Sequence, residues 1–348
     1  MNLMDLIQHK YRIISVVGMA KNAGKTVTLN QLIDEAMDRK ITLGITSTGR
    51  DGEKLDVVTN TEKPLIYVEQ GTLIATTEET FKYAEATLEL LEITTYYTAL
   101  GRIILARAVT PGNVQLAGPS TSTEIRAIAE KMLQYGAQLV IVDGAIDRIA
   151  AASPTVTEAT ILATGAVLSR DMDQVIERSL HQIKLFSLPA VENAELRDLL
   201  SEIMEEKGFC IINKNDKVYR FALQTALNGG DVIAHAMDED TAYVGLGGAL
   251  VSGTLKQLME HTDQYKKVVF VVKDATRIFI QSKDWLYFMK AGFRIEVIDK
   301  IHPLAVTVNP YAPQGYYFDP QEFQDKLKKF LYPIPVFDVV MGGGYECS

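Results

Sequence analysis

The stretch GMAKNAGKT (residues 18–26) follows the apolar run RIISVV (12–17) and leads into VTLNQLIDEAMD (27–38), whose apolar residues recur at helical spacing. A strand, a glycine-containing loop and a helix in this order favour phosphate binding, because the loop amides and the helix N-terminus face the same anion. Glycine at position 24 lets the backbone come close to such a ligand. The contacts predicted for the phosphate groups of ATP come from Gly18, Lys21, Asn22, Ala23, Gly24, Lys25, Thr26 and Val27.

Two side chains of this loop have predicted roles in the chemistry. Lys25 is expected to contact the β- and γ-phosphates, which makes it a catalytic candidate, and Thr26 is expected to offer its hydroxyl to Mg²⁺. Five residues separate Gly18 from Gly24, whereas the standard pattern has four, so the loop is a variant. Its spacing resembles the loop of dethiobiotin synthetase and related amidoligases, a branch of the P-loop proteins. The alternative is a tight strand-to-helix turn that binds nothing.

A second candidate lies at the end of another apolar run, in AQLVIVDGAIDR (137–148). Asp143 directly follows this run, and a carboxylate there is costly unless it is solvated or bound to a cation. We therefore expect Asp143 to hold Mg²⁺ together with Thr26, as the acidic residue of a P-loop protein does. A loop aspartate that caps the next turn is the alternative. Asp147 and Arg148 are further candidates in the same loop.

The polar loop TSTGRDGEKLD (46–56) follows the second predicted strand. In P-loop proteins the corresponding loop orders a water or a metal beside the γ-phosphate and acts as a switch. Asp51 is accordingly a catalytic candidate for positioning water, Glu53 for contacting magnesium, and Arg50 for contacting an anion. A solvated loop without a role is the alternative.

In PGNVQLAGPSTSTE (111–124), Thr121 and Glu124 have the spacing of a capping box. Capping alone explains this pattern, and a ligand contact by Asn113, Ser120 or Thr121 is the alternative.

Two segments of the second half are also glycine- or tyrosine-rich. YVGLGGALVSGTLKQL (243–258) is typical of a strand, a glycine turn and a helix, and a packing turn is favoured over a second cofactor cradle because the dinucleotide fingerprint is incomplete. NPYAPQGYYFDP (309–320) places three tyrosines and three prolines on a predicted surface loop. It is interpreted either as a partner patch or as a stiff connector.

Apolar runs alternate with helical periods along the chain, which predicts an α/β fold with a mostly parallel sheet. We expect a P-loop ATPase domain at residues 1–207 and a smaller α/β domain, possibly partner-binding, at 208–348. Strands are predicted at 12–17, 42–46, 64–68, 102–106, 138–142, 159–163, 209–212, 243–246, 268–272, 294–298 and 304–308. Helices are predicted at 25–39, 78–91, 121–135, 171–184, 193–206, 252–262, 283–289 and 320–331.

Composition excludes several classes of protein. The 348 residues carry 35 Lys plus Arg and 44 Asp plus Glu, a net charge of −9 that disfavours nucleic acid as a partner. Cys210 and Cys347 are too few for a disulfide framework, and the five histidines show no zinc-site spacing. The sequence has no long uncharged apolar run, so we expect a cytoplasmic protein that does not bind membranes.

GMAKNAGKT, ITSTGRDGE, VTPGNVQLAGPSTSTE, IVDGAIDR and TEATILATGA, in this order and spacing, resemble one family. It is the ATPase subunit of the reactivating factor of lysine 5,6-aminomutase, an adenosylcobalamin- and pyridoxal-phosphate-dependent enzyme of clostridial lysine fermentation. VGLGGALVSGTL and VTVNPYAPQGYYFDP are similar to the same family, so the resemblance covers most of the chain.

The resemblance implies an ATPase that acts as a chaperone for another enzyme. Such a factor uses ATP and Mg²⁺ to open the mutase, so that damaged cobalamin leaves and an intact cofactor enters. Its partners would be the adenosylcobalamin-dependent aminomutase and a second reactivase subunit, and many proteins of this branch form homodimers. Two alternatives remain: an ATP-dependent carboxylate ligase like dethiobiotin synthetase, with Lys21, Arg50 and Arg148 in its substrate pocket, and a nucleotide-responsive regulator without turnover.

Overall fold

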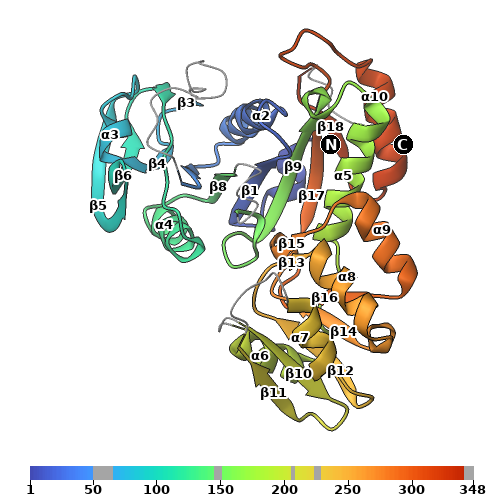
Figure 1. The fold of residues 1–348 in the computed structure, drawn as a ribbon. Helices are drawn as coiled ribbons and strands as arrows, with labels where there is room; N and C mark the ends of the chain where they lie inside the picture. The colour runs from blue at the N-terminus through green and yellow to red at the C-terminus, as the bar shows by residue number, and fades with distance from the viewer. Residues whose placement is uncertain (50–65, 145–150, 205–207, 223–228, 341–348) are drawn as a thin grey trace. The chain divides into compact units, whose positions relative to one another are not determined.

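The computed structural model describes residues 1–49, 66–144, 151–204, 208–222 and 229–340. It divides the chain into two units, one formed by residues 1–180 and 302–348 and the other by residues 181–301. Each unit is an α/β structure built around its own sheet (Figure 1). The predicted α/β class with a large, mostly parallel sheet is confirmed.

The first unit contains a nine-stranded sheet. From β18 to β4 all neighbouring strands are parallel, and β6 and β5 extend one end in antiparallel fashion. The strands in sheet order are β18 (Val336–Asp338), β17 (Pro303–Asn309), β9 (Ala159–Gly165), β1 (Ile13–Gly18), β8 (Leu139–Gly144), β2 (Leu43–Ser47), β4 (Leu73–Thr77), β6 (Gly101–Ala108) and β5 (Leu88–Thr98). A separate antiparallel pair is formed by β3 (Ile66–Val68) and β7 (Gly112–Val114).

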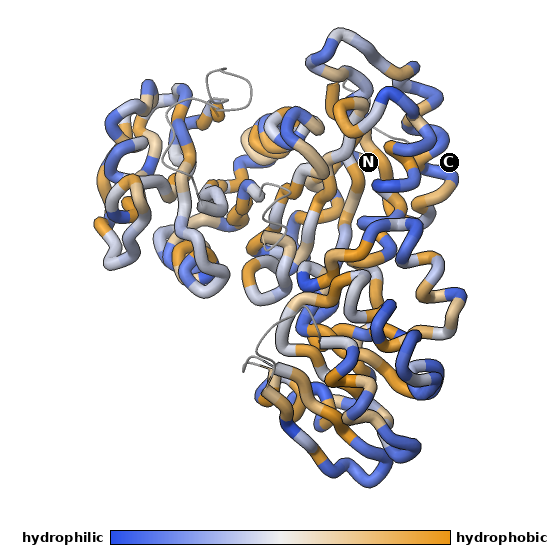
Figure 2. Tube along the Cα trace, viewed as in Figure 1, coloured by the Kyte–Doolittle hydropathy of each residue, from blue (hydrophilic) through white to orange (hydrophobic). Residues whose placement is uncertain are grey.

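The central strands of this sheet are buried on both faces. Every residue of β1 and of β9 is buried, which is why both read as unbroken apolar or small-residue runs rather than as alternating ones. Figure 2 shows hydrophobic residues concentrated in the sheet, whereas the helices alternate between hydrophobic and polar positions. The helices of this unit are α1 (Leu3–Ile7), α2 (Lys25–Asp38), α3 (Glu78–Phe81), α4 (Ser122–Gln134), the short η2 (Ala166–Leu168), α5 (Met172–Phe186), which continues into the second unit, and α10 (Pro320–Leu331).

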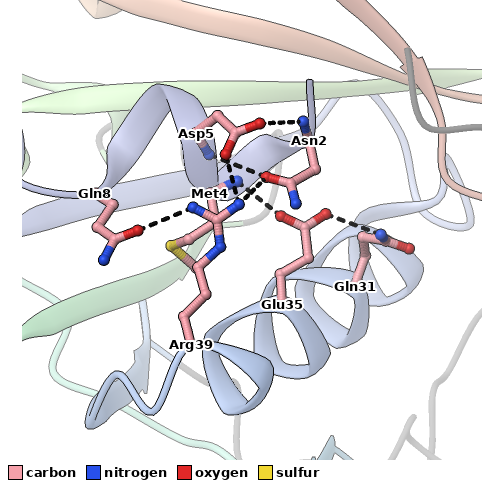
Figure 3. A network of polar contacts seen from close by, with 7 residues as sticks. All are labelled: Asn2, Met4, Asp5, Gln8, Gln31, Glu35 and Arg39. Carbon is pink, nitrogen blue, oxygen red and sulfur yellow. Dashed lines mark hydrogen bonds and ion pairs between the residues drawn. The ribbon is translucent and has the colours of Figure 1, made fainter. Parts of the chain in front are cut away.

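Helix α1 is fixed to α2 by a polar network (Figure 3). Asn2 caps α1 by accepting from the Asp5 backbone N–H at 3.1 Å, and Arg39 at the end of α2 donates to the side chains of both residues. Glu35, a buried carboxylate of α2, accepts from the Met4 backbone N–H at 2.7 Å. The network gives hydrogen-bond partners to polar groups that α1 would otherwise leave unpaired, and it holds α1 against the C-terminal part of α2.

The second unit has a five-stranded sheet in the order β11 (Val218–Phe221), β10 (Phe209–Asn213), β12 (Thr241–Leu246), β14 (Val269–Val272) and β16 (Arg294–Val297). The last three strands are parallel, and β10 runs antiparallel to both of its neighbours. Its other elements are α6 (Ala194–Ile203), α7 (Gly229–Ala236), β13 (Leu250–Val251), α8 (Ser252–His261), η4 (Gln264–Lys266), η5 (Ala275–Arg277), β15 (Ile278–Phe279) and α9 (Ser282–Ala291).

The units differ from the predicted division at residues 207 and 208. Residues 302–348 belong to the first unit, because β17 pairs with β9 and β18 pairs with β17. Residues 181–207 belong to the second unit, where Leu200 and Ile203 of α6 pack in a core with Cys210 and Val271. The second unit is therefore inserted into the first, a topology that no local pattern in the sequence indicates.

The helix predicted over residues 78–91 is wrong. A single helical turn, α3, ends at Phe81, and the chain then forms the long strand β5 from Leu88. Strand β5 turns back through Gly101, at φ 97°, to form an antiparallel hairpin with β6. The β-branched and aromatic residues in ITTYYT (93–98) gain cross-strand contacts in this hairpin, and these outweigh the helical spacing of the residues before them.

Candidate functional site

The loop at residues 18–26 connects β1 to α2, as the sequence predicts. Gly24 is the N-cap residue of α2, and no side chain forms a cap hydrogen bond to the first turn of this 14-residue helix. Helices α8 and α9 likewise have no side-chain cap, whereas Thr121, Asn193 and Asp319 cap α4, α6 and α10 with their side chains. The first N–H groups of an α-helix have no partner within the helix, so α2 presents amides to an anion at the end of this loop.

Glycine is required at position 24 for two reasons. The residue has φ 99°, in the left-handed region that side-chain-bearing residues rarely adopt. A Cβ atom here would also lie 2.9 Å from the Cβ of Asn309, at the end of β17. The loop therefore passes so close to β17 that a side chain at residue 24 does not fit.

Lys25 and Asp143 form an ion pair across this end of the sheet. The Lys25 Nζ lies 2.9 Å from Asp143 Oδ1, and both side chains are largely but not fully buried. Asp143 lies on β8 beside Val16 of β1, so its carboxylate sits next to the strand that leads into the loop. A lysine and an aspartate held at the mouth of an uncapped helix are the groups that a nucleotide phosphate and its cation require.

The donor set fits a magnesium ion that is bound together with phosphates. Within the described parts of the chain, no group of three or more His, Cys, Asp or Glu residues could hold a metal ion by itself. Mg²⁺ commonly uses one or two carboxylates, several waters and substrate phosphates instead of a full protein cage. Asp143, near the C-terminal end of β8, supplies a carboxylate, and Thr26, in the first turn of α2, supplies a hydroxyl; both are ligand types that Mg²⁺ uses.

The end of β2 and the segment before α4 adjoin Asp143. The Thr48 backbone N–H donates to the Asp143 carbonyl at 3.0 Å, and the Gly49 N–H donates to the Pro119 carbonyl at 2.8 Å. A Cβ on Gly118 would lie 1.6 Å from the Ser47 carbonyl oxygen, so these two segments are in direct backbone contact. The loop predicted to act as a switch therefore begins beside Asp143.

Five of the predicted candidates lie outside the described residues. They are Arg50, Asp51, Glu53, Asp147 and Arg148. The predictions for water positioning, magnesium contact and anion contact by these residues remain predictions.

The remaining loop residues are placed as follows. Gly18 and Ala23 are buried, Lys25 and Thr26 are half-buried, and Lys21, Asn22 and Val27 are exposed. Gly18 ends β1, and a Cβ on it would lie 3.4 Å from the Lys25 Cβ. The eight residues predicted to contact phosphate thus lie at the end of β1, in the loop that follows it and in the first turn of α2.

Sequence reasoning missed the contribution of β17. Asn309 Nδ2 donates to the Asn22 carbonyl at 3.3 Å, which joins the end of β17 to the loop. One turn into α2, the Thr28 hydroxyl lies 2.7 Å from the Thr307 hydroxyl, and both residues are buried. The only signal in the sequence was an apolar strand ending in a polar residue, and that signal does not say which strand is its neighbour.

The weaker candidates have structural roles. The Thr121 hydroxyl accepts from the Glu124 N–H at 3.3 Å, so Thr121 caps α4 as expected. Asn113 donates to Glu85 at 2.7 Å on β7. The glycine turn after β12 leads into β13, which pairs with β15, and this favours the packing interpretation. Cys210 is fully buried, and burial raises the pKa of its thiol.

Comparison of the chain with models of known protein families finds no match, and comparison with curated proteins finds none either. Among the helices of the described residues, none combines the length and apolar character needed to cross a membrane.

Proposed function

We propose that this chain is a Mg²⁺-dependent ATPase that reactivates an adenosylcobalamin-dependent aminomutase of the lysine 5,6-aminomutase type. The observation that carries the nucleotide part is the Lys25–Asp143 ion pair at the uncapped N-terminus of α2. The reactivation part rests on the resemblance of five ordered motifs to the reactivating-factor family.

In this proposal, different residues at the loop would hold the triphosphate and its cation. The amides at the start of α2 and the charge of Lys25 would bind the phosphate oxygens, while Asp143 and Thr26 would hold the cation. Magnesium, when bound, neutralises the charge of the β- and γ-phosphates. The ion pair between Lys25 and Asp143 places the ammonium group at the mouth of the loop, and the pair would exchange for contacts to phosphate and cation when the ligand binds.

Reactivation requires that nucleotide state changes the affinity for the mutase. A ligand shifts a conformational equilibrium only as far as it binds the two states differently. Thr48, in the described part of the predicted switch loop, donates to the Asp143 carbonyl, so a change at the γ-phosphate would reach the start of that loop. We propose that Asp51 and Glu53 in this segment position the attacking water and the cation.

The test is ATP hydrolysis with Mg²⁺, measured for the protein alone and with an inactivated adenosylcobalamin aminomutase plus any second reactivase subunit. We expect slow basal hydrolysis, stimulation by the mutase, and a loss of about a hundredfold or more in Lys25→Ala. Lys131→Ala is the matched control, because Lys131 forms an ion pair of 2.7 Å with Glu92 on β5, at the far edge of the same sheet.

Three outcomes separate the possible functions. Stimulation that vanishes in Lys25→Ala and persists in Lys131→Ala supports the reactivating ATPase. Turnover that appears only with a small carboxylate would identify a ligase instead. Tight ATP binding without turnover under any condition would identify a regulator.

A further inference from the structure

The strand order indicates on which side of the loop a nucleoside would lie. Strand β1 has β8 as its neighbour on one side, and β9 followed by β17 on the other. The β8 side carries Asp143 and the backbone contact of Thr48, so in the proposed function it would face the terminal phosphate and its cation. The rest of a bound nucleotide would therefore extend across β9 towards β17, which is two strand spacings, or about 10 Å, from β1.

A small hairpin occupies that side. After β17 the chain turns back on itself between Tyr311 and Tyr317, which form an antiparallel bridge. The Ala312 N–H donates to the Tyr316 carbonyl at 2.9 Å, and Gly315 provides the turn at φ 84°. In Figure 1 this segment is the orange-red loop between β17 and α10.

Two contacts fix the hairpin beside the phosphate loop. The amide group of Asn309 donates to the Asn22 carbonyl and accepts from the Tyr311 N–H at 3.0 Å, so one side chain joins the loop to the hairpin. The Tyr316 hydroxyl donates to the carbonyl of Ala166, the first residue of η2 directly after β9, at 2.7 Å. These hydrogen bonds connect the hairpin both to the loop at residues 18–26 and to the residue that follows β9.

This hairpin presents two aromatic rings to solvent. Tyr317 is 71% exposed and Tyr311 is 42% exposed, and their ring centroids lie 6.1 Å apart. The two rings pair across the bridge with their planes tilted by 37°, and each still leaves a large part of its surface exposed. Planar bases stack on exposed aromatic rings, and such stacking tolerates different bases.

We propose that Tyr311 and Tyr317 form the platform for the base of a purine nucleoside triphosphate whose phosphates occupy the loop at residues 18–26. This inference rests on the proposed nucleotide binding and adds the site of the base. Both polar groups of the Asn309 amide are engaged by the loop and the hairpin, so the base is held by stacking more than by hydrogen bonds. ATP and GTP are therefore expected to bind with similar affinity.

The test compares Mg²⁺ complexes of ATP, GTP and inorganic tripolyphosphate, which has no base, by isothermal titration calorimetry. Tyr317→Ala and Tyr311→Ala should each weaken ATP binding about tenfold and leave tripolyphosphate binding unchanged. Tyr317→Phe should bind ATP as the parent chain does. Tyr97→Ala is the matched control, because Tyr97 is 70% exposed and lies on β5 at the opposite edge of the same sheet.

The outcomes distinguish failure of the platform from failure of nucleotide binding. If both tyrosine variants bind ATP like the parent chain while Lys25→Ala loses both ligands, the platform is wrong and the phosphate loop stands. If the tyrosine variants lose ATP and tripolyphosphate equally, they disturb the loop and the stacking role is overturned. If the parent chain binds neither ligand, the proposed function and the platform fail together.

Discussion

Replacing Gly24 with alanine tests how closely the loop at residues 18–26 packs against β17. Gly24 has φ 99°, and its missing Cβ would lie 2.9 Å from the Cβ of Asn309. An L-residue in left-handed backbone costs about 1–2 kcal/mol, and overpacking costs about 1–3 kcal/mol more. We expect Gly24→Ala to lower the free energy of unfolding by about 2–5 kcal/mol.

Gly136→Ala is the control for the backbone cost alone. Gly136 has φ 104°, close to that of Gly24, but no atom lies within 4 Å of its Cβ position. The difference between the two variants therefore measures the contact with Asn309. In a chain that carries Asn309→Gly, the extra destabilisation by Gly24→Ala over Gly136→Ala should disappear, because the Asn309 Cβ is then absent.

The assay is urea denaturation followed by far-ultraviolet circular dichroism. Fluorescence of Trp285, the one tryptophan of the chain, follows the 181–301 unit separately. Equal destabilisation by Gly24→Ala and Gly136→Ala would refute the close packing of the loop on β17. It would also remove the geometric basis for placing the tyrosine hairpin beside the loop at residues 18–26.

Three further predictions concern the support of this loop and the second unit. Thr28→Val should lower the free energy of unfolding by about 1–2 kcal/mol by leaving the buried Thr307 hydroxyl unpaired, and the double valine variant should lose less than the sum in the same urea assay. Glu35 is 7% exposed, and its carboxylate accepts from the Met4 N–H. Glu35→Ala removes this acceptor and should lower the free energy of unfolding by about 2 kcal/mol in the same assay, whereas Glu35→Gln keeps an acceptor and should lower it less. Burial raises the pKa of the Cys210 thiol, so the unfolded chain loses the thiol proton at a lower pH than the folded chain does. The contribution of this group to the free energy of unfolding should be constant below the usual thiol pKa and should fall as pH rises above it. Cys210→Ser should make this fall smaller in the same urea assay.

Much of the site was predictable because its residues are close in sequence. GMAKNAGKT contains the turn, the lysine and the start of the helix in one stretch. Asp143 directly follows an apolar run, and this run forms the buried strand β8. Local patterns of this type reflect contacts within a few residues. The strand, the loop and α2 were therefore found within one or two residues of their observed bounds.

The region of residues 78–98 was harder to predict. The spacing of apolar residues indicated a helix over 78–91. Residues 88–98 form strand β5 instead, because they pair with β6 in a hairpin. The stability of a strand depends on its neighbour across the sheet, which the strand's own residues do not specify.

The sequence by itself determined a strand, a glycine-containing loop and a helix, and an aspartate at the end of another buried strand. Only the tertiary structure decided that Asp143 pairs with Lys25, that residues 302–340 return to the first sheet, and that Asn309 meets the loop. The reason is physical: helical and turn preferences arise from neighbours along the chain, whereas the order of strands in a sheet arises from the burial of all its faces at once. Residues separated by 287 positions in sequence, Asn22 and Asn309, are joined only by that global packing.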